Sequence, residues 1–189
     1  MTPAIPSDSG HLLLMLRDLL DNAVLWWGLA ACGLAQLSKL FVELALHGRW
    51  RPAVLFETGG MPSSHSALMT GTAAGIGWTQ GFQDPLFALA AALCFVVLYD
   101  ASGVRYAAGR TAARVNSLVG GNEITGSLWE NPLKENLGHT KLEVLAGSVM
   151  GPLVALPGLA LIGTPLHLIQ QVSQLLSPLL SPSLPAALG

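Results

Sequence analysis

The chain has 189 residues, of which 51% are hydrophobic and only 11% are charged, and its formal net charge is -2. A soluble domain usually carries about 25% charged residues. Together with a mean hydropathy of +0.54, this composition predicts an all-α, polytopic membrane protein. A basic face for nucleic acid is missing, so we expect no nucleic-acid partner.

Hydrophobic segments divide the chain into predicted elements. Residues 11–21 form a short amphipathic stretch, which we expect to lie at the membrane interface. Four membrane helices are predicted at residues 23–46, 66–82, 85–98 and 142–163. The third can extend beyond the membrane as far as Asn116. Residues 1–163 therefore form one membrane-embedded domain, and residues 164–189 form an apolar, proline-rich tail that is membrane-associated or partly disordered.

Basic residues predict the orientation of these helices. With four spans, the loops at residues 47–58 and 99–141 share one face of the membrane, which carries most of the basic residues of the chain. The positive-inside rule places this face in the cytoplasm. The two loops share a face, and the charge difference between the faces follows, only if the number of spans is even.

The first candidate site is the turn Pro62-Ser63-Ser64-His65, which follows a glycine pair and precedes an apolar run. A helix that begins here offers free backbone N–H groups, two hydroxyls and an imidazole to an anion. The turn lies at the predicted cytoplasmic end of the second span.

The second candidate is His139 with Glu143, at the cytoplasmic start of the fourth span. Residues four apart share a helix face, so the carboxylate can fix one imidazole nitrogen and leave the other free as a nucleophile or base. An ordinary helix-start ion pair is the alternative.

Glycine spacing connects the two candidates. The second and fourth spans are predicted to run parallel, and each carries a Gly-x3-Gly step after its motif, at Gly71 and Gly75 and at Gly147 and Gly151. Such steps allow close contact of membrane helices. They allow His65 and His139 to meet, and nearby basic residues can then clamp a phosphoryl group without metal.

Three blocks of this sequence resemble the divergent type-2 phosphatidic acid phosphatase family, which is related to acid phosphatases and vanadium haloperoxidases. They are Gly59-Gly-Met-Pro-Ser-Ser-His-Ser-Ala67, Tyr99-Asp-Ala-Ser-Gly-Val-Arg105 and Leu137-Gly-His-Thr-Lys-Leu-Glu-Val144. The resemblance covers roughly residues 34–151. It implies a helical membrane bundle that acts on a lipid phosphate.

The resemblance also implies roles for individual residues. His139 would be the nucleophile, Glu143 its orienting partner, and His65 the acid that protonates the leaving oxygen. The implied phosphate-binding residues are Lys39, Arg51, Arg49, Ser63, Ser64, Arg105 and Lys134. The two last residues are candidates because the arginine of the family's third motif would fall at Leu133, which cannot bind phosphate.

Asp100 belongs to the branch that this chain resembles and is expected to support the site or to form a structural ion pair with Arg105. A divalent cation held by Asp100 with Glu123, Glu130 or Glu143 is a weaker alternative, since no ligand spacing supports it. We therefore expect neither a metal nor another cofactor.

These observations predict a metal-independent lipid phosphate phosphatase with a phosphohistidine intermediate, facing the cytoplasm or stroma of a bacterial inner membrane or plastid-type membrane. Its expected partners are the bilayer, a lipid phosphate and, in a homodimer, a second copy that helps to enclose the site. The main alternative is an inactive relative that binds anionic lipid or a partner protein. A small transporter is a third reading, although no inverted repeat supports it.

Overall fold

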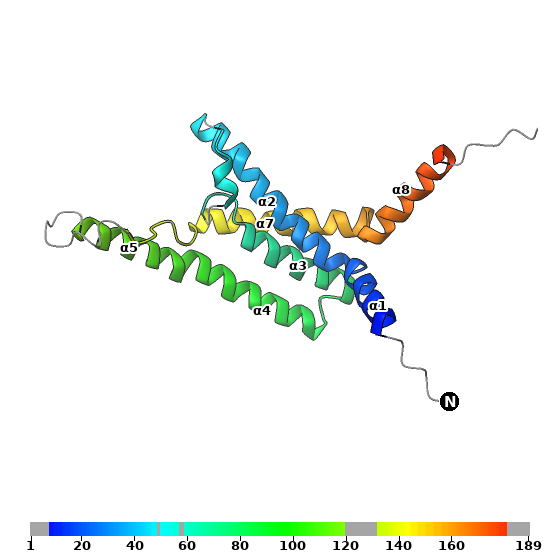
Figure 1. Ribbon diagram of the computed structural model, residues 1–189. Coiled ribbons are helices and arrows are strands. Elements are labelled where there is room, and N and C mark those ends of the chain that lie inside the picture. Colours follow the sequence, from blue (N-terminus) through cyan, green and yellow to red (C-terminus); the bar gives the residue numbers. More distant parts are fainter. Residues whose placement is uncertain (1–7, 49, 57–58, 120–131, 181–189) are drawn as a thin grey trace, which may run out of the picture.

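The computed structural model describes residues 8–48, 50–56, 59–119 and 132–180, and these ranges contain helices without a strand (Figure 1). The predicted all-α fold is confirmed. The elements are α1 (Asp8–Leu20), α2 (Ala23–His47), the 3-10 helix η1 (Pro52–Phe56), α3 (Ser64–Gln80), α4 (Pro85–Tyr99), the π-helix η2 (Asp100–Val104), α5 (Arg105–Val119), α7 (Lys141–Leu161) and α8 (Pro165–Leu180).

Three helical stretches of the described chain are long and apolar enough to cross a membrane: Ala23–Leu46, Pro85–Leu118 and Lys141–Leu161. They correspond to three of the four predicted spans. The remaining prediction, at residues 66–82, corresponds to α3, which has 17 residues. At 1.5 Å per residue α3 is about 26 Å long, slightly less than a hydrocarbon core of about 30 Å. The predicted count of four spans is therefore approximate.

Helix α3 lies at the centre of the bundle and packs against α7, α2 and α4. Small residues make these contacts close. A Cβ atom at Gly71 would lie 3.2 Å from the carbonyl oxygen of Gly151 and 3.3 Å from Cβ of Ala31. About two turns earlier in both helices, the N–H of Ser63 donates to the carbonyl of Glu143 at 3.0 Å. The two glycine-stepped helices therefore run parallel and in contact, as predicted.

Helix α4 continues without interruption through η2 into α5, so that the third predicted helix extends well past the apolar segment (Figure 1). The chain then returns alongside α5. Asn116 exchanges two hydrogen bonds of 2.9 Å with the backbone of Leu133. Gly109 leaves room for this return, since a Cβ there would lie 2.4 Å from the carbonyl oxygen of Glu135. The return brings His139 back to η2.

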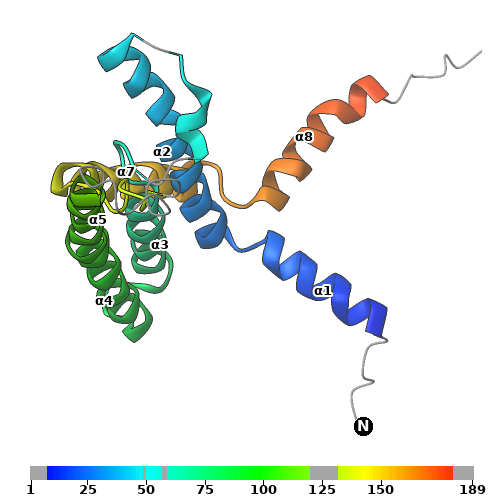
Figure 2. The same ribbon diagram turned by 60° about the vertical axis from the view of Figure 1, so that its left-hand side comes forward.

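The helices α1 and α8 leave the bundle at the same end, and both views show them pointing away from it (Figures 1 and 2). Adjacent tryptophans near the start of α2 anchor the chain where α1 and α8 leave the bundle. The indole of Trp26 donates to the carbonyl of Leu19 at 3.0 Å, and that of Trp27 donates to Gly163 at 2.8 Å. Helix α8 occupies much of the segment predicted as an apolar tail.

Candidate active site

His139 is held in place by its backbone as well as by its side chain. Its N–H donates to the carbonyl of Ala101 at 2.9 Å. The preceding Gly138 has φ +78, and a Cβ at this position would lie 2.3 Å from the backbone nitrogen of Tyr106. Only glycine combines this conformation with such a close approach. As a result, the His139 side chain is fixed against η2 and only 4% exposed.

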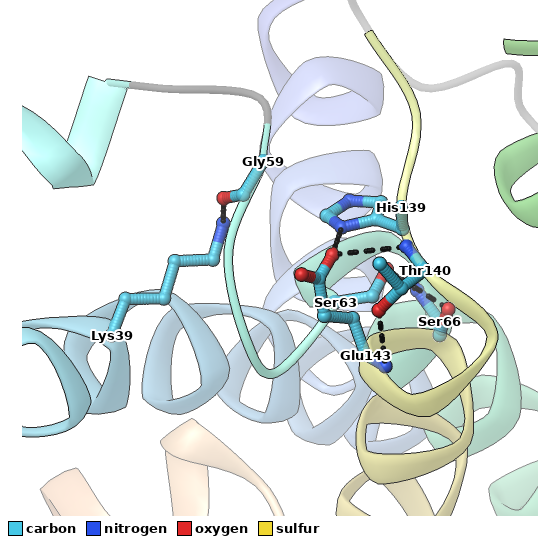
Figure 3. Close-up of polar contacts among 7 residues, drawn as sticks. All are labelled: Lys39, Gly59, Ser63, Ser66, His139, Thr140 and Glu143. Atoms are coloured by element: carbon cyan, nitrogen blue, oxygen red, sulfur yellow. Dashed lines mark hydrogen bonds and ion pairs between the residues drawn. The ribbon is translucent and has the colours of Figure 1, made fainter. Parts of the chain in front are cut away.

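The imidazole of His139 contacts the carboxylate of Glu143, with 3.0 Å between Nδ1 and Oε2 (Figure 3). The predicted pairing is confirmed. A capping box fixes the carboxylate in turn, because Oε2 accepts the N–H of Thr140 at 3.2 Å while the Thr140 hydroxyl accepts the N–H of Glu143 at 3.3 Å. A carboxylate at Nδ1 favours the tautomer with its proton there. Nε2 then carries the lone pair.

The Pro62–His65 turn begins α3 as predicted, but its serines face inward. Ser63 is fully buried, and its hydroxyl accepts hydrogen bonds from the backbone N–H and the hydroxyl of Ser66, at 3.3 and 2.9 Å (Figure 3). It therefore caps the helix. Ser64 is also buried. The phosphate-binding roles of both serines stay predictions.

Both histidines line one cavity of about 280 Å³, here called the histidine cavity. Its walls are His65, Val96, Val97, Asp100, Ala101, Arg105, Leu137, Gly138 and His139. The predicted meeting of the two histidines is confirmed. The ion pair predicted for Asp100 and Arg105 is present as well, with Nε of the guanidinium donating to Oδ2 of the carboxylate.

The surroundings of His65 disfavour its protonation. His65 lies in the first turn of α3, before the predicted span and outside the three spans given above. Burial is the largest cause that lowers the pKa of His65, followed by the nearby charges of His139, Arg105 and Lys39. When His65 is protonated, these neighbours make it a stronger acid than an ordinary histidine.

A second cavity of about 430 Å³ shares Leu137 and Gly138 with the first, and is here called the cation cavity. The charged residues in its wall are Lys39, Glu43, Arg51, Arg110, Glu135 and Glu143. Lys39 is only 3% exposed, and its ammonium group donates to the carbonyl of Gly59 at 2.9 Å (Figure 3). The predicted phosphate-binding cations are therefore divided between two neighbouring cavities.

The predicted cations differ in their positions. Arg105 faces the two histidines, whereas Lys39 and Arg51 line the cation cavity. Lys134 is exposed and is not among the residues that line either cavity, and its role stays a prediction. Arg49 lies outside the described residues.

Sequence reasoning did not select Arg110 or Tyr106, although both line the cation cavity. They are four residues apart on α5 and therefore share a helix face. That spacing was the available signal. The expectation of a long polar segment at residues 99–139 does not make use of it.

Among the described residues, no group of three or more His, Cys, Asp or Glu side chains is placed to hold a metal ion. Asp100 and Glu143, the described residues of the alternative cation site, line different cavities. Glu123 and Glu130 lie outside the described residues.

Residues 20–154, which include every described site residue named above, match a family described as the Divergent PAP2 family. The chain belongs to this family. The match confirms the resemblance found in the three sequence blocks and relates this membrane protein to the phosphatases of that name. It leaves the reaction itself to be argued from the site.

Similarity to an individual protein supports the membrane assignment. A protein of Bacillus subtilis (strain 168), named as the uncharacterized membrane protein YuiD, is 35% identical over 150 residues. These cover 74% of this chain and 95% of the relative. No solved structure matches the chain.

Proposed function

We propose that this member of the Divergent PAP2 family is a metal-independent phosphatase that removes the phosphate of a membrane lipid through a phosphohistidine intermediate. The observation that supports this most is the pairing of Glu143 with the buried His139, which lines the same cavity as His65. A nucleophile oriented by a carboxylate, with a proton donor for the leaving group nearby, suits covalent phosphoryl transfer.

The proposed reaction has two steps. In the first, Nε2 of His139 attacks phosphorus, the bond from phosphorus to the lipid alcohol breaks, and His65 gives its proton to the departing oxygen. In the second, His65 takes a proton from water, which attacks phosphorus from the side that the alcohol has left. The bond between phosphorus and His139 then breaks and inorganic phosphate is released.

Positive charge near the histidines would stabilise the transition state of the proposed reaction. Arg105 faces the histidine cavity, and Lys39, Arg51 and Arg110 line the neighbouring one. The N-termini of α3 and α7 also meet here, so that their helix dipoles favour an anion at the site. Charges of this kind stabilise the equatorial oxygens of a phosphoryl group in the transition state.

We further propose that this end of the bundle faces the cytoplasm or the stroma, because the basic loops emerge there. The membrane would be a bacterial inner membrane or a plastid-type membrane. A second copy of the chain would help to enclose the site, since Arg105 and other residues of the site end are solvent-exposed in the single chain.

The alternative is a binding protein that retains the pocket without turnover. Leu133 replaces the family arginine, and Arg105, which would have to substitute for it, already pairs with Asp100. These two observations favour binding of an anionic lipid headgroup without hydrolysis.

A phosphate-release assay distinguishes the phosphatase from the binding protein. The detergent-purified protein is given a panel of lipid phosphates, with and without chelator. His139→Ala and His65→Ala should each abolish release, whereas His167→Ala, at the start of α8 away from the site, should not. Release that survives His139→Ala would refute the nucleophile assignment. Lipid binding without release from any substrate would establish the alternative.

A further inference from the structure

Helix α8 has an apolar face that the rest of the chain does not cover. The side chains of this face recur at the spacing of one helical stripe and are all exposed: Leu168, Ile169, Val172, Leu175 and Leu176. Within the described residues α8 packs along no other helix, and both views show it turning away from the bundle (Figures 1 and 2). The occupant of this face must therefore come from outside the bundle.

The opposite face of α8 is polar but carries no acidic or basic side chain. It presents Gln170, Gln171, Ser173, Gln174 and Ser177. The two serine hydroxyls donate to backbone carbonyls of the same helix, at 2.8 and 2.9 Å. Residues 164–189 contain no Asp, Glu, Lys or Arg, and His167 is the only ionisable side chain of the helix. The helix therefore has no permanent charge with which to attract an anionic lipid or a charged protein.

The start of α8 lies where a membrane span ends. Three residues separate it from the span Lys141–Leu161. Within this connection the carbonyl of Gly163 accepts the indole N–H of Trp27, and the first turn of α8 lies beside the same indole. Tryptophan is enriched at the level of the lipid headgroups. Because His139 lies just before the start of α7, α8 begins at the opposite surface of the membrane.

The length of α8 does not suit a further span. Its 16 described residues are about 24 Å long, whereas a hydrocarbon core is about 30 Å thick. Its row of glutamines and serines would also lie in hydrocarbon if the helix crossed the bilayer. A helix that lies parallel to the membrane surface, by contrast, needs an apolar face toward the acyl chains and a polar face toward water. Helix α8 has both.

We infer that α8 binds the bilayer interface on the side opposite to the site, with Leu168, Val172 and Leu175 inserted among the acyl chains, and that apolar contact alone holds it there. A basic amphipathic helix is drawn to anionic lipid. Since α8 lacks that attraction, its binding depends on how readily the bilayer admits apolar side chains. It should bind loosely packed bilayers and leave tightly packed ones. The inference does not depend on the reaction proposed for the site, and α8 lies beyond residues 20–154, which match the family.

Two cysteine variants test whether the apolar face is covered. Val172→Cys and Gln174→Cys place a thiol on opposite sides of α8, because two residues correspond to about 200° of turn. The full chain is placed in phosphatidylcholine nanodiscs, which leave both membrane surfaces open to a water-soluble maleimide. Fully burying one aliphatic side chain corresponds to a factor of roughly 10 to 150, so Gln174→Cys should react about tenfold faster or more. The unaltered chain, whose own thiols are Cys32 and Cys94, gives the background rate. Equal rates for the two variants would overturn the inference.

A bimane attached to Val172→Cys identifies what covers the face. In vesicles of phosphatidylcholine brominated on its acyl chains, bromine should quench this bimane but not one attached to Gln174→Cys. Diluting the protein in lipid should leave the quenching unchanged. A bimane at position 172 that is protected without being quenched, or whose protection is lost on dilution, would overturn the inference, because protein, such as a second copy of the chain, would then cover the face.

The lipid dependence tests the absence of an electrostatic contribution. Adding phosphatidylglycerol or salt should leave the maleimide rate of Val172→Cys unchanged, since salt screens only charge interactions. Replacing unsaturated by tightly packed saturated lipid should raise that rate severalfold, while the rate of Gln174→Cys stays the same. Protection that requires anionic lipid, or that does not respond to lipid packing, would overturn the inference.

Discussion

Replacing Gly147 by alanine tests whether the contact between α3 and α7 places the site. A methyl group at position 147 would lie 2.2 Å from the carbonyl oxygen of Ser63 and 3.0 Å from Cβ of Ser66. Carbon and carbonyl oxygen ordinarily approach to about 3.3 Å. The two helices must therefore separate by roughly 1 Å, at the level where the turn that carries His65 meets Glu143.

The expected change in the free energy of unfolding has two opposing parts. Overpacking a close contact costs typically about 1–3 kcal/mol, whereas exchanging glycine for alanine within a helix gains up to about 1 kcal/mol. Gly33→Ala isolates the first part, because Gly33 is also inside a helix and a Cβ there would meet nothing within 4 Å. The difference between the two variants should therefore be about 1–3 kcal/mol, with Gly147→Ala the less stable.

Thermal unfolding of the purified variants in detergent provides the measurement. For chains of this length, 1 kcal/mol corresponds to about 2–4 °C in Tm, so Gly147→Ala should unfold several degrees below Gly33→Ala. Because a 1 Å misplacement can cost about a hundredfold in rate, lipid phosphate turnover should fall in Gly147→Ala and be unchanged in Gly33→Ala. Equal Tm values for the two variants would refute the close parallel contact of α3 and α7.

Three further predictions concern the site. Glu143→Gln keeps the shape of the side chain but removes the charge that fixes His139, and should reduce kcat by about 10²–10⁴-fold in a phosphate-release assay; a loss below threefold would contradict the orienting role. Thr140→Ala removes the cap of α7 and should lower the free energy of unfolding by about 1 kcal/mol, measured as Tm beside Ser148→Ala as a mid-helix control. The third prediction is a pH profile. The acid step needs protonated His65, whose pKa is lowered, so kcat/KM should fall as pH rises through a value below about 6.5. Because the charge of Arg105 contributes to the lowered pKa, Arg105→Gln should move that fall to higher pH. A profile whose alkaline limb does not move in Arg105→Gln would argue against His65 as the acid.

The bundle was predictable because its determinants are local. Apolar runs of membrane length set the helices, and the glycine steps set which helices touch. Gly71 and Gly151 meet as the spacing predicts. The pairing of His139 with Glu143 was predictable for the same reason, since residues four apart on a helix always share a face.

The positions of the cations were not predictable from sequence spacing. Lys39 is on α2 and Arg51 lies just before η1, so the number of residues between them says little about their distance in space. Both line a cavity beside the one that contains the histidines, together with Arg110 from α5. Sequence spacing also does not show how the Ser63 hydroxyl is used. A serine immediately before a helix is a common cap, and the structure uses its hydroxyl in that way.

The π-helix η2 explains how this chain presents an arginine to the histidines although Leu133 occupies the expected position. In an α-helix, Asp100 and Arg105 would point in different directions, because residues five apart do not share a face. In η2 the backbone N–H of Arg105 donates to the carbonyl of Asp100, five residues earlier. This wider turn brings the two side chains onto one side, where they pair and line the histidine cavity. The same turn presents the carbonyl of Ala101 to the N–H of His139. One irregular turn therefore positions both a cation and the proposed nucleophile, which accounts for Asp100 and Arg105 occurring together in one block of this sequence.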